Sequence, residues 1–332
     1  MNTIYEGDPF NTAEACDSHP IDRPRVPLLL RLAAKPFGIT KSTIEFLLLG
    51  LTRRFNTTDF SASSDYLYKL ETVKNWTLAP CGSCYSDAPP HNPSFFDEIE
   101  THRYTTHPWL RQAINSFSIS GKNVLEIGYG MGTDHLSLAR QNGTLYGIDL
   151  TPRSRDLTEE HLKLNGYNSH LTVGDAELLP YENNYFDFVY SFGVVHHSPN
   201  TDQIISEIHR VLKPGGRCYI AVYHKHSLFF WWSVFLINFV VRGGYRKRTL
   251  QQQLSLIEYP NQNENMVIKL YSRSEFAALF HRFGWVQSYV RHLIPADLVI
   301  LSKLFTNPNA PNPVLTRLGA KMGWYVIVEA TK

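Results

Sequence analysis

From Phe95 onwards, short apolar segments alternate with segments of helical periodicity. Apolar stretches of about six residues separated by helices are typical of a parallel α/β sheet. Apolar residues at helical spacing also predict a helix at Gln203–Leu212, which the Lys-Pro-Gly-Gly sequence at 213–216 ends. The apolar stretches predict strands at Asn123–Ile127, Thr144–Ile148, Ser169–Val173, Phe186–Phe192 and Arg217–Tyr223.

The alternation is interrupted at residues 224–270, which are apolar first, then basic, then rich in Gln and Asn. We expect a helix beyond them at Ser272–Phe283, because Ser272 and Glu275 have the spacing of a capping box. Two late strands complete an expected total of seven, at Trp285–His292 and Trp324–Ala330.

The N-terminal part has a different pattern, with apolar helical candidates near Leu28–Ala34 and Thr43–Phe55 and a loop rich in Pro, Cys and Ser after them. We therefore expect two regions. Residues 1–94 would form a helical extension that caps the substrate, and residues 95–332 would form the α/β domain, with 224–270 as an inserted second cap.

The composition excludes several classes of protein. With 43% hydrophobic and 19% charged residues, the chain is expected to be globular rather than disordered. A net charge of +2 offers no strong field for nucleic acid or anionic membranes. The most apolar segment, Leu228–Val241, is too short to span a bilayer, and Met1–Phe10 lacks the apolar core of a secretory signal. We expect a cytoplasmic protein without stable membrane insertion.

A glycine-rich segment joins the first strand to a helix, in the sequence VLEIGYGMGT. Gly128, Gly130 and Gly132 allow a tight turn and a close approach of a ligand to the backbone. The spacing is G-x-G-x-G, whereas the dinucleotide fingerprint is G-x-G-x-x-G/A, and Thr133 stands where that fingerprint needs a small residue. Glu126, just before the first glycine, suits an ammonium group better than a pyrophosphate. A tight turn without any ligand is the alternative.

Acidic residues also follow the next two strands. Asp149 ends the second strand, where a carboxylate can accept hydrogen bonds from both ribose hydroxyls. Asp175 follows the third strand with Ala176, and an acidic side chain beside a backbone N–H can bind the amine and a ring nitrogen of adenine. The alternatives are a charge at a helix N-terminus for Asp149 and an ordinary turn for Asp175.

Together these segments resemble the class I S-adenosylmethionine (SAM)-dependent methyltransferases, and within them the broad group that includes ubiquinone and menaquinone biosynthesis methyltransferases. The residues Phe95–Ile99, Arg103-Tyr104 and Pro108-Trp109 are similar to the N-terminal flank of bacterial small-molecule members. The matching core segments cover about a hundred residues and are specific as a set. They are VLEIGYGMGT, GIDLTP, GDAELLPYENNYFDFVYSFGVVHH and EIHRVLKPGGR.

The resemblance implies a Rossmann-like α/β fold. Its seven-stranded sheet would have an antiparallel last strand and helices on both faces, and SAM would lie at the carboxyl ends of the strands. Glu126 would meet the methionine end of SAM, Asp149 the ribose, and Asp175 with Ala176 the adenine. Tyr129 departs from the small residue or Cys of many relatives. The expected cofactor-binding residues are Tyr104, Trp109, Glu126, Gly128, Gly130, Gly132, Asp149, Leu150, Asp175, Ala176 and Phe192.

Candidate catalytic residues follow the fourth and fifth strands, beside the expected position of the transferred methyl group. His196 or His197 could act as a general base, and Tyr223 could contact the acceptor. Packing or loop hydrogen bonds are the alternative for each. Aromatic faces attract cations, so Tyr104 and Trp109 could line the SAM sulfonium.

The insertion joins an aromatic segment to a basic turn. Phe229, Trp231 and Trp232 could line an apolar chain, and Arg242, Arg246 and Lys247 could bind an anionic head group. A prenyl diphosphate has both parts, so C-methylation of an isoprenoid in terpenoid biosynthesis, with or without cyclisation, is the first hypothesis. A buried cap helix with a solvated basic turn is the alternative.

Other functions remain as alternatives on the sequence alone. One is O- or C-methylation of a quinone, phenol or polyketide, and another is a SAM-binding regulatory protein without catalysis. Cys81 and Cys84 have the spacing of half a zinc site, but no second pair follows. We expect no resident metal, and Mg²⁺ only through a diphosphate substrate. Phe192–Val195 stands where base-amino methyltransferases carry Asn/Asp-Pro-Pro-Tyr/Phe, which argues against a nucleic-acid substrate.

Overall fold

The computed structural model describes residues 62–90, 92–258 and 268–332. All of these residues belong to one compact unit. The helices expected at Leu28–Ala34 and Thr43–Phe55 lie outside the described residues, and the domain boundary at residue 94 stays a prediction.

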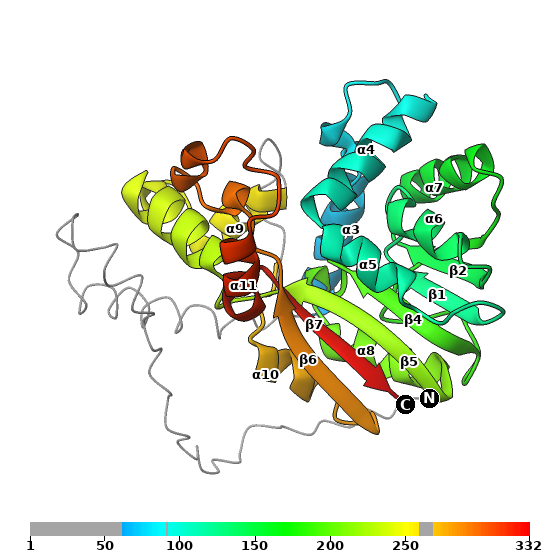
Figure 1. Ribbon diagram of the computed structural model, residues 1–332. Coiled ribbons are helices and arrows are strands. Elements are labelled where there is room, and N and C mark those ends of the chain that lie inside the picture. The colour runs from blue at the N-terminus through cyan, green and yellow to red at the C-terminus, as the bar shows by residue number, and fades with distance from the viewer. Residues whose placement is uncertain (1–61, 91, 259–267) are drawn as a thin grey trace, which may run out of the picture. The chain divides into compact units, whose positions relative to one another are not determined.

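A seven-stranded sheet forms the centre of this unit (Figure 1). Its strand order is β3-β2-β1-β4-β5-β7-β6. The first five strands are parallel, and β7 lies antiparallel between β5 and β6. The expected seven-stranded α/β sheet with an antiparallel last strand is therefore confirmed. The strands are β1 (Asn123–Ile127), β2 (Thr144–Asp149), β3 (His170–Val173), β4 (Phe186–Phe192), β5 (Leu212–Tyr223), β6 (Trp285–Arg291) and β7 (Tyr325–Thr331).

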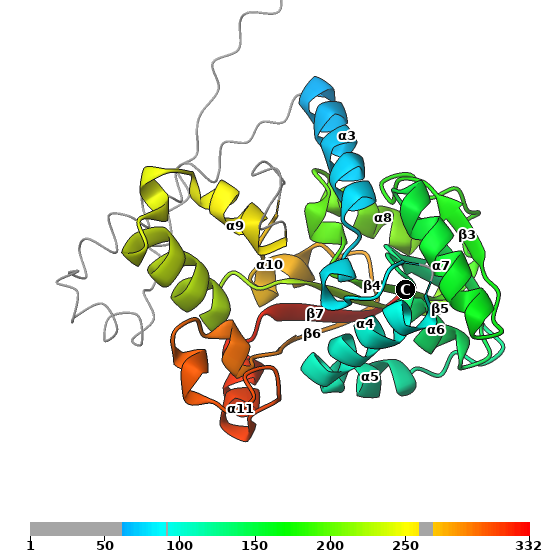
Figure 2. The ribbon, with the colours of Figure 1, turned by 90° about the horizontal axis from the view of Figure 1, so that it is seen from above.

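Helices cover both faces of the sheet. Figure 2 shows α5 and α6 on one face and α8 and α10 on the other, and α7 packs beside α6. The long helix α3 and helix α4 lie toward the carboxyl ends of the parallel strands (Figure 1). These helices are α3 (Ala62–Leu78), α4 (Pro93–Thr106), α5 (Pro108–Asn115), α6 (Thr133–Ala139), α7 (Pro152–Leu164), α8 (Thr201–Val211) and α10 (Arg273–Ala278).

The main hydrophobic core lies between the sheet and the pair α8 and α10. Ile204 and Ile208 of α8 and Phe276 of α10 pack with strand residues such as Val189 and Val328. All five side chains are at most 2% exposed. Each buried aliphatic or aromatic side chain stabilises the fold by roughly 1.5–3 kcal/mol, and together they hold these helices against the sheet. The apolar spacing in α8 that predicted a helix is the face that packs here.

The boundaries of some predicted elements are wrong. Helix α8 ends at Val211, and the Lys-Pro-Gly-Gly sequence expected as a turn belongs to β5, which starts at Leu212. A register shift between Phe186 and Phe188 of the neighbouring strand accommodates it. Helix α10 ends at Ala278, well before the expected Phe283, although its capping box between Ser272 and Glu275 is present.

The described part of the insertion, residues 224–258, and a second segment between β6 and β7 together form a smaller helical body, here called the cap (Figures 1 and 2). The Trp232 Nε1–H donates to the Val299 carbonyl oxygen across the two segments, at 2.8 Å. None of the helices in the described part of the chain is long and apolar enough to cross a membrane. The cap contains η4 (Phe229–Val241), η5 (Gly244–Arg246), α9 (Leu250–Glu258), η6 (Pro295–Asp297), η7 (Leu301–Leu304) and α11 (Pro313–Met322).

Candidate active site

A cavity of about 270 Å³ opens at the carboxyl ends of the parallel strands. The ends of β1, β2, β4 and β5 and the loops after the strands supply part of its lining, and α3, α4 and the first residue of β7 supply much of the remainder. Open α/β sheets bind ligands at this edge. Of the predicted cofactor and catalytic residues, the cavity lining includes Glu126, Gly128, Gly130, Asp149, Leu150, Asp175, Ala176, Phe192, His197 and Tyr223.

The glycine loop has left-handed backbone conformations that suit glycine. Gly128 and Gly132 both have φ near +78°, and a Cβ atom on Gly128 would lie 2.3 Å from Val194. Gly130 has φ +56°, but a Cβ atom there would meet no protein atom within 4 Å. Gly132 does not line the cavity; a side chain there would press on Thr158 of α7. Gly130 therefore borders the open space of the cavity, whereas Gly132 allows the loop to pack closely against α7.

Glu126 is held by a chain of buried hydrogen bonds behind the glycine loop. Its Oε2 lies 2.7 Å from His135 Nδ1, and His135 Nε2 lies 2.8 Å from Ser169 Oγ. The Ser169 hydroxyl donates to the Leu145 carbonyl, so its oxygen accepts from His135 Nε2–H. One further proton then lies between His135 Nδ1 and Glu126, and burial raises the pKa of Glu126. The sequence did not identify His135 as the partner that orients Glu126.

Asp149 ties the glycine loop to the start of α7. Its Oδ2 accepts from the Gly130 N–H at 3.1 Å, and its Oδ1 accepts from the Thr151 N–H at 3.0 Å. Thr151, rather than Asp149, caps α7 and accepts from the Ser154 N–H. Each carboxylate oxygen can accept more than one hydrogen bond, so Asp149 can hold the loop and still bind ribose hydroxyls. Burial raises its pKa.

Helix α3 brings a lysine to the predicted adenine site. Lys69 Nζ lies 2.6 Å from both Asp175 Oδ2 and Glu177 Oε2, and its pairing with the two carboxylates raises the pKa of Lys69 against the opposing effect of burial. From the same helix, the Tyr68 hydroxyl donates to the His197 carbonyl at 2.7 Å. An adenine amine at Asp175 would therefore share the carboxylate with Lys69. No motif around Lys69 indicated this contact.

Arg103 and Asp134 form a largely buried ion pair in the wall of the cavity. Arg103 Nε donates to Asp134 Oδ1 at 2.7 Å, and the hydroxyls of Tyr104 and Tyr190 donate to the same carboxylate. The guanidinium of Arg103 also lies 4.9 Å from the centre of the Phe192 ring. Arg103 lines the cavity, whereas Tyr104 does not, because its hydroxyl is turned toward Asp134. The resemblance indicated the Arg-Tyr pair but not which side chain reaches the cavity.

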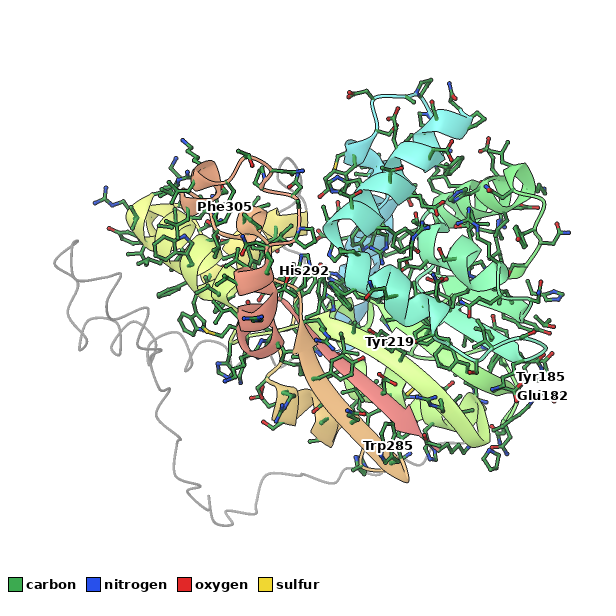
Figure 3. All side chains as sticks on the ribbon, in the orientation of Figure 1. Glu182, Tyr185, Tyr219, Trp285, His292 and Phe305 are labelled. Atoms are coloured by element: carbon green, nitrogen blue, oxygen red, sulfur yellow. The ribbon has the colours of Figure 1, made fainter. Side chains whose placement is uncertain are left out.

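Trp109 also lies outside the cavity lining. Its Nε1–H donates to His292 Nδ1 at 3.4 Å, behind Phe192 and Tyr325. Figure 3 shows His292 just beyond the end of β6 that faces the cap, opposite Trp285 at the other end. A sulfonium contact by Tyr104 or Trp109 stays a prediction that this geometry does not favour.

The two predicted histidines after β4 have different surroundings. His196 is fully buried, does not line the cavity, and has no hydrogen-bond partner among the described residues for either ring nitrogen. Burial lowers the pKa of His196 well below its usual value, with a smaller contribution from His197. His197 and Tyr223 do line the cavity. Of the three predicted catalytic residues, His196 is the one that cannot reach an acceptor in this structure.

The predicted substrate residues all lie in the cap and outside the cavity lining. Trp231 packs on Phe235 inside η4, and Phe229 contacts Trp324, which in turn stacks on Tyr223. The side chains of the basic turn point elsewhere: Arg242 donates to Asn238, and Arg246 lies over Tyr245. A substrate contact by this set stays a prediction. The residues concerned are Phe229, Trp231, Trp232, Arg242, Arg246 and Lys247.

Two cavity residues that sequence reasoning missed are His107 and Tyr325. Tyr325 begins β7 and pairs in register with Tyr223 at the end of β5. The antiparallel last strand therefore brings its first residue to the same edge as the carboxyl ends of the parallel strands, and the predicted topology already implied this. His107 lies between α4 and α5, where no motif distinguishes it.

The described residues contain no group of three or more His, Cys, Asp or Glu side chains placed to hold a metal ion. Cys81 and Cys84 are exposed thiols, and Cys81 lies at the cavity lining. That the protein has no resident metal stays a prediction.

Comparisons with known proteins agree with the site. Residues 125–220 match the family model described as a methyltransferase domain. The phthiotriol/phenolphthiotriol dimycocerosates methyltransferase of Mycobacterium leprae is 36% identical over 30% of this chain and 37% of its own length. The sterol 4-C-methyltransferase strm-1 of Caenorhabditis elegans is 32% identical over 28% of each chain. A SAM-dependent methyltransferase structure from Thermotoga maritima has 18% identity and a TM-score of 0.47, covering 72% of this chain and 97% of that chain.

The two curated relatives are matched over only 37% and 28% of their own lengths, so the similarity concerns the domain and not the whole proteins. That region holds the glycine loop, Glu126, Asp149 and Asp175, which surround one end of the cavity. Residues 125–220 are therefore a methyltransferase domain, and the resemblance to the class I SAM-dependent methyltransferases is supported over that region.

Proposed function

We propose that this protein transfers the methyl group of SAM to a lipophilic small molecule bound in the same cavity. The observation that carries the proposal is the order of groups along the lining. Three carboxylates lie near the carboxyl ends of neighbouring strands: Glu126 in β1, Asp149 in β2 and Asp175 just after β3. The space over Gly130 is open. These groups fit the ammonium, ribose and adenine of SAM. Bound SAM supplies an electrophilic methyl group on a sulfonium.

The other end of the cavity suits an apolar acceptor. Aromatic side chains from five different elements line the cavity. Both lining cations are engaged by carboxylates: Lys69 by Asp175 and Glu177, and Arg103 by Asp134. An aromatic wall contributes apolar contact and faces that attract a cationic centre. Besides Tyr129 of the glycine loop, the aromatic lining residues are Tyr68, Trp76, Tyr85, Phe192, Tyr223 and Tyr325.

Within this class, an isoprenoid diphosphate has less support than a neutral lipophile such as a quinone, phenol or polyketide. The aromatic wall could shield a carbocation formed by alkene methylation. However, the cations proposed for the diphosphate, Arg242, Arg246 and Lys247, do not line the cavity. The prenyl diphosphate hypothesis would therefore need the cap to close in a way that brings the basic turn to the substrate.

The basic turn provides a direct test of that hypothesis. If the acceptor is a prenyl diphosphate, charge reversal in Arg246→Glu/Lys247→Glu should raise KM for farnesyl diphosphate roughly several-fold, because an attraction becomes a repulsion, and should leave the Kd of SAM unchanged. Reversal at the exposed Arg155 of α7 is the matched control. An unchanged KM would show that the basic turn does not bind the diphosphate head group.

The proposed activity is tested by following conversion of SAM to S-adenosylhomocysteine. The purified protein is incubated with SAM and a panel of lipophilic phenols, hydroxylated polyketides, quinones and prenyl diphosphates, and products are identified by mass spectrometry. We expect turnover with a neutral lipophile. Tight SAM binding without turnover of any acceptor would instead favour a SAM-binding regulatory protein.

The ribose assignment gives a quantitative prediction. Asp149→Ala should weaken SAM binding by about 1.5–3 kcal/mol, roughly ten- to a hundredfold in Kd, because hydrogen bonds to a charged acceptor are lost. Titration calorimetry measures the effect. Asp187→Ala is the control, because that carboxylate also accepts a backbone N–H, at 2.9 Å, but lies at the opposite end of the strands. Equal affinity in the two variants would contradict the assignment.

A further inference from the structure

An imidazole with one defined tautomer lies at the acceptor end of the cavity. His107 ends α4 and begins α5. Its Nδ1 lies 2.8 Å from Thr106 Oγ1 and 3.2 Å from the Arg103 carbonyl oxygen. The carbonyl can only accept, and the Thr106 hydroxyl already donates to the His102 carbonyl at 2.8 Å. The proton of the neutral ring is therefore on Nδ1, and Nε2 is an acceptor.

The Nε2 atom of His107 faces the Tyr325 hydroxyl. Nε2 lies 3.4 Å from the hydroxyl of Tyr325, and both residues line the cavity. The His107 ring stacks on His292 at 4.1 Å and meets Phe192 edge-on at 6.3 Å. Phe192 in turn ends β4, beside the strand ends that carry the predicted cofactor residues. A basic nitrogen and a phenol hydroxyl thus lie where the acceptor would approach the methyl group.

The surroundings of His107 keep it neutral. Burial, followed by the neighbouring His292 and Arg103, lowers the pKa of His107 well below its usual value. His102 of the same helix acts in the same direction, and the Arg103 carbonyl opposes it. Asp297 lies 3.7 Å from Nε2 of His292, the ring that stacks on His107. A neutral imidazole is the form that can accept a proton.

We propose that His107 Nε2, assisted by the Tyr325 hydroxyl, accepts the proton of an acceptor hydroxyl, and that this protein is an O-methyltransferase of lipophilic alcohols or phenols. The proposal rests on the proposed function of the site. The acceptor oxygen bonds to the methyl carbon while the S–CH₃ bond breaks and its electron pair stays on sulfur; the O–H proton passes to Nε2. One positive charge is lost from sulfur as one appears on His107, so the net charge of the cavity does not change.

His107 is better placed for this step than the histidines after β4. Both ring nitrogens of His196 are buried away from the cavity lining. The ring of His197 packs edge-on against Trp76 of α3 at 5.8 Å, and its backbone carbonyl receives the Tyr68 hydroxyl.

Kinetics provide the first test, with para-octylphenol as the hydroxyl probe and farnesyl diphosphate as the alkene probe. His107→Asn keeps a donor toward the Arg103 carbonyl but removes the basic nitrogen. It should lower kcat for para-octylphenol by roughly a hundredfold or more, the usual contribution of a general base, with little change in KM or in the Kd of SAM. Wild-type kcat should not fall as the pH decreases through about 6.5, where an ordinary histidine becomes protonated. His170→Asn, on the exposed edge strand β3, is the control.

NMR of protein labelled with ¹⁵N-histidine provides a second test that needs no turnover. The His107 resonances, assigned by their loss in His107→Asn, should show the neutral Nδ1–H tautomer from about pH 7.5 to about pH 5.5. An Nε2–H tautomer, or protonation in that range, overturns the proposal. So does methylation only at carbon of farnesyl diphosphate, or loss of activity in His197→Asn but not in His107→Asn. In these cases the methyltransferase function itself still stands; it fails only if the wild-type protein does not bind SAM.

Discussion

The Asp134→Ala variant should lose about 3 kcal/mol of unfolding free energy, because the substitution leaves the Arg103 guanidinium in a mostly buried site without its carboxylate. Asp134 is 5% exposed and receives Arg103 and the hydroxyls of Tyr104 and Tyr190. Arg103 keeps 26% of its side chain exposed toward the cavity, so water offsets part of the loss, and the value lies at the lower end for a broken buried pair. Denaturant unfolding measures the difference.

A solvent-exposed ion pair provides the matched control. Glu159 and Lys163 of α7 lie 2.6 Å apart, and both are more than half exposed. Glu159→Ala should therefore cost less than about 0.5 kcal/mol. If Asp134→Ala is no less stable than Glu159→Ala, the buried pair does not stabilise the fold. The partners of Asp134, Arg103 first, lower its pKa despite burial. Because the folded-state pKa is depressed, this stability should be present above the pKa of the unfolded carboxyl and be lost only as the pH falls through the lower folded-state value.

The sheet was predictable because its evidence is local. An apolar run ending in glycines fixes β1, and its boundaries agree with the structure. Carboxylates near the carboxyl ends of β1 and β2 had to meet at one edge once the strands were parallel, and both Glu126 and Asp149 line the cavity. The predicted boundaries that are wrong are those that depend on the pairing of neighbouring strands. β5 takes in the Lys-Pro-Gly-Gly segment because Phe186 of β4 pairs with Leu212 across a register shift, which no property of that segment reveals.

The rest of the site depends on contacts between segments that are distant in sequence. Lys69 reaches Asp175 from a helix more than a hundred residues earlier, and nothing in its local sequence indicates a partner. Adjacency in sequence was misleading for the cap: Phe229 follows β5 closely, yet it packs on Trp324 rather than into the cavity. His107 is informative only when Thr106, the Arg103 carbonyl and Tyr325 are placed around its ring. Tertiary structure alone supplies that arrangement.

Gly130 offers a test of the cofactor site that separates ligand space from backbone strain. Its φ of +56° disfavours any L side chain, and a Cβ atom there meets no protein atom within 4 Å. Gly166, after the end of α7, shares both properties with φ +79°, but it does not line the cavity. A substitution at either glycine should therefore lower the free energy of unfolding by a similar amount, on the order of 1–3 kcal/mol for a strained backbone. Only at Gly130 does the added side chain enter the space proposed for SAM.

We therefore expect Gly130→Val to lower SAM affinity by roughly a hundredfold or more, since a branched side chain would exclude a ligand that needs close approach to the backbone. Gly166→Val should bind SAM as the wild-type protein does. Calorimetry gives the two affinities, and denaturant unfolding verifies that the stability losses are comparable. Gly130→Val with normal SAM affinity would show that the cofactor does not pass over this glycine, even if Asp149→Ala weakens binding. A loss of equal size in Gly166→Val would instead attribute the effect at Gly130 to strain, because both positions have a left-handed φ and open space around an added Cβ atom.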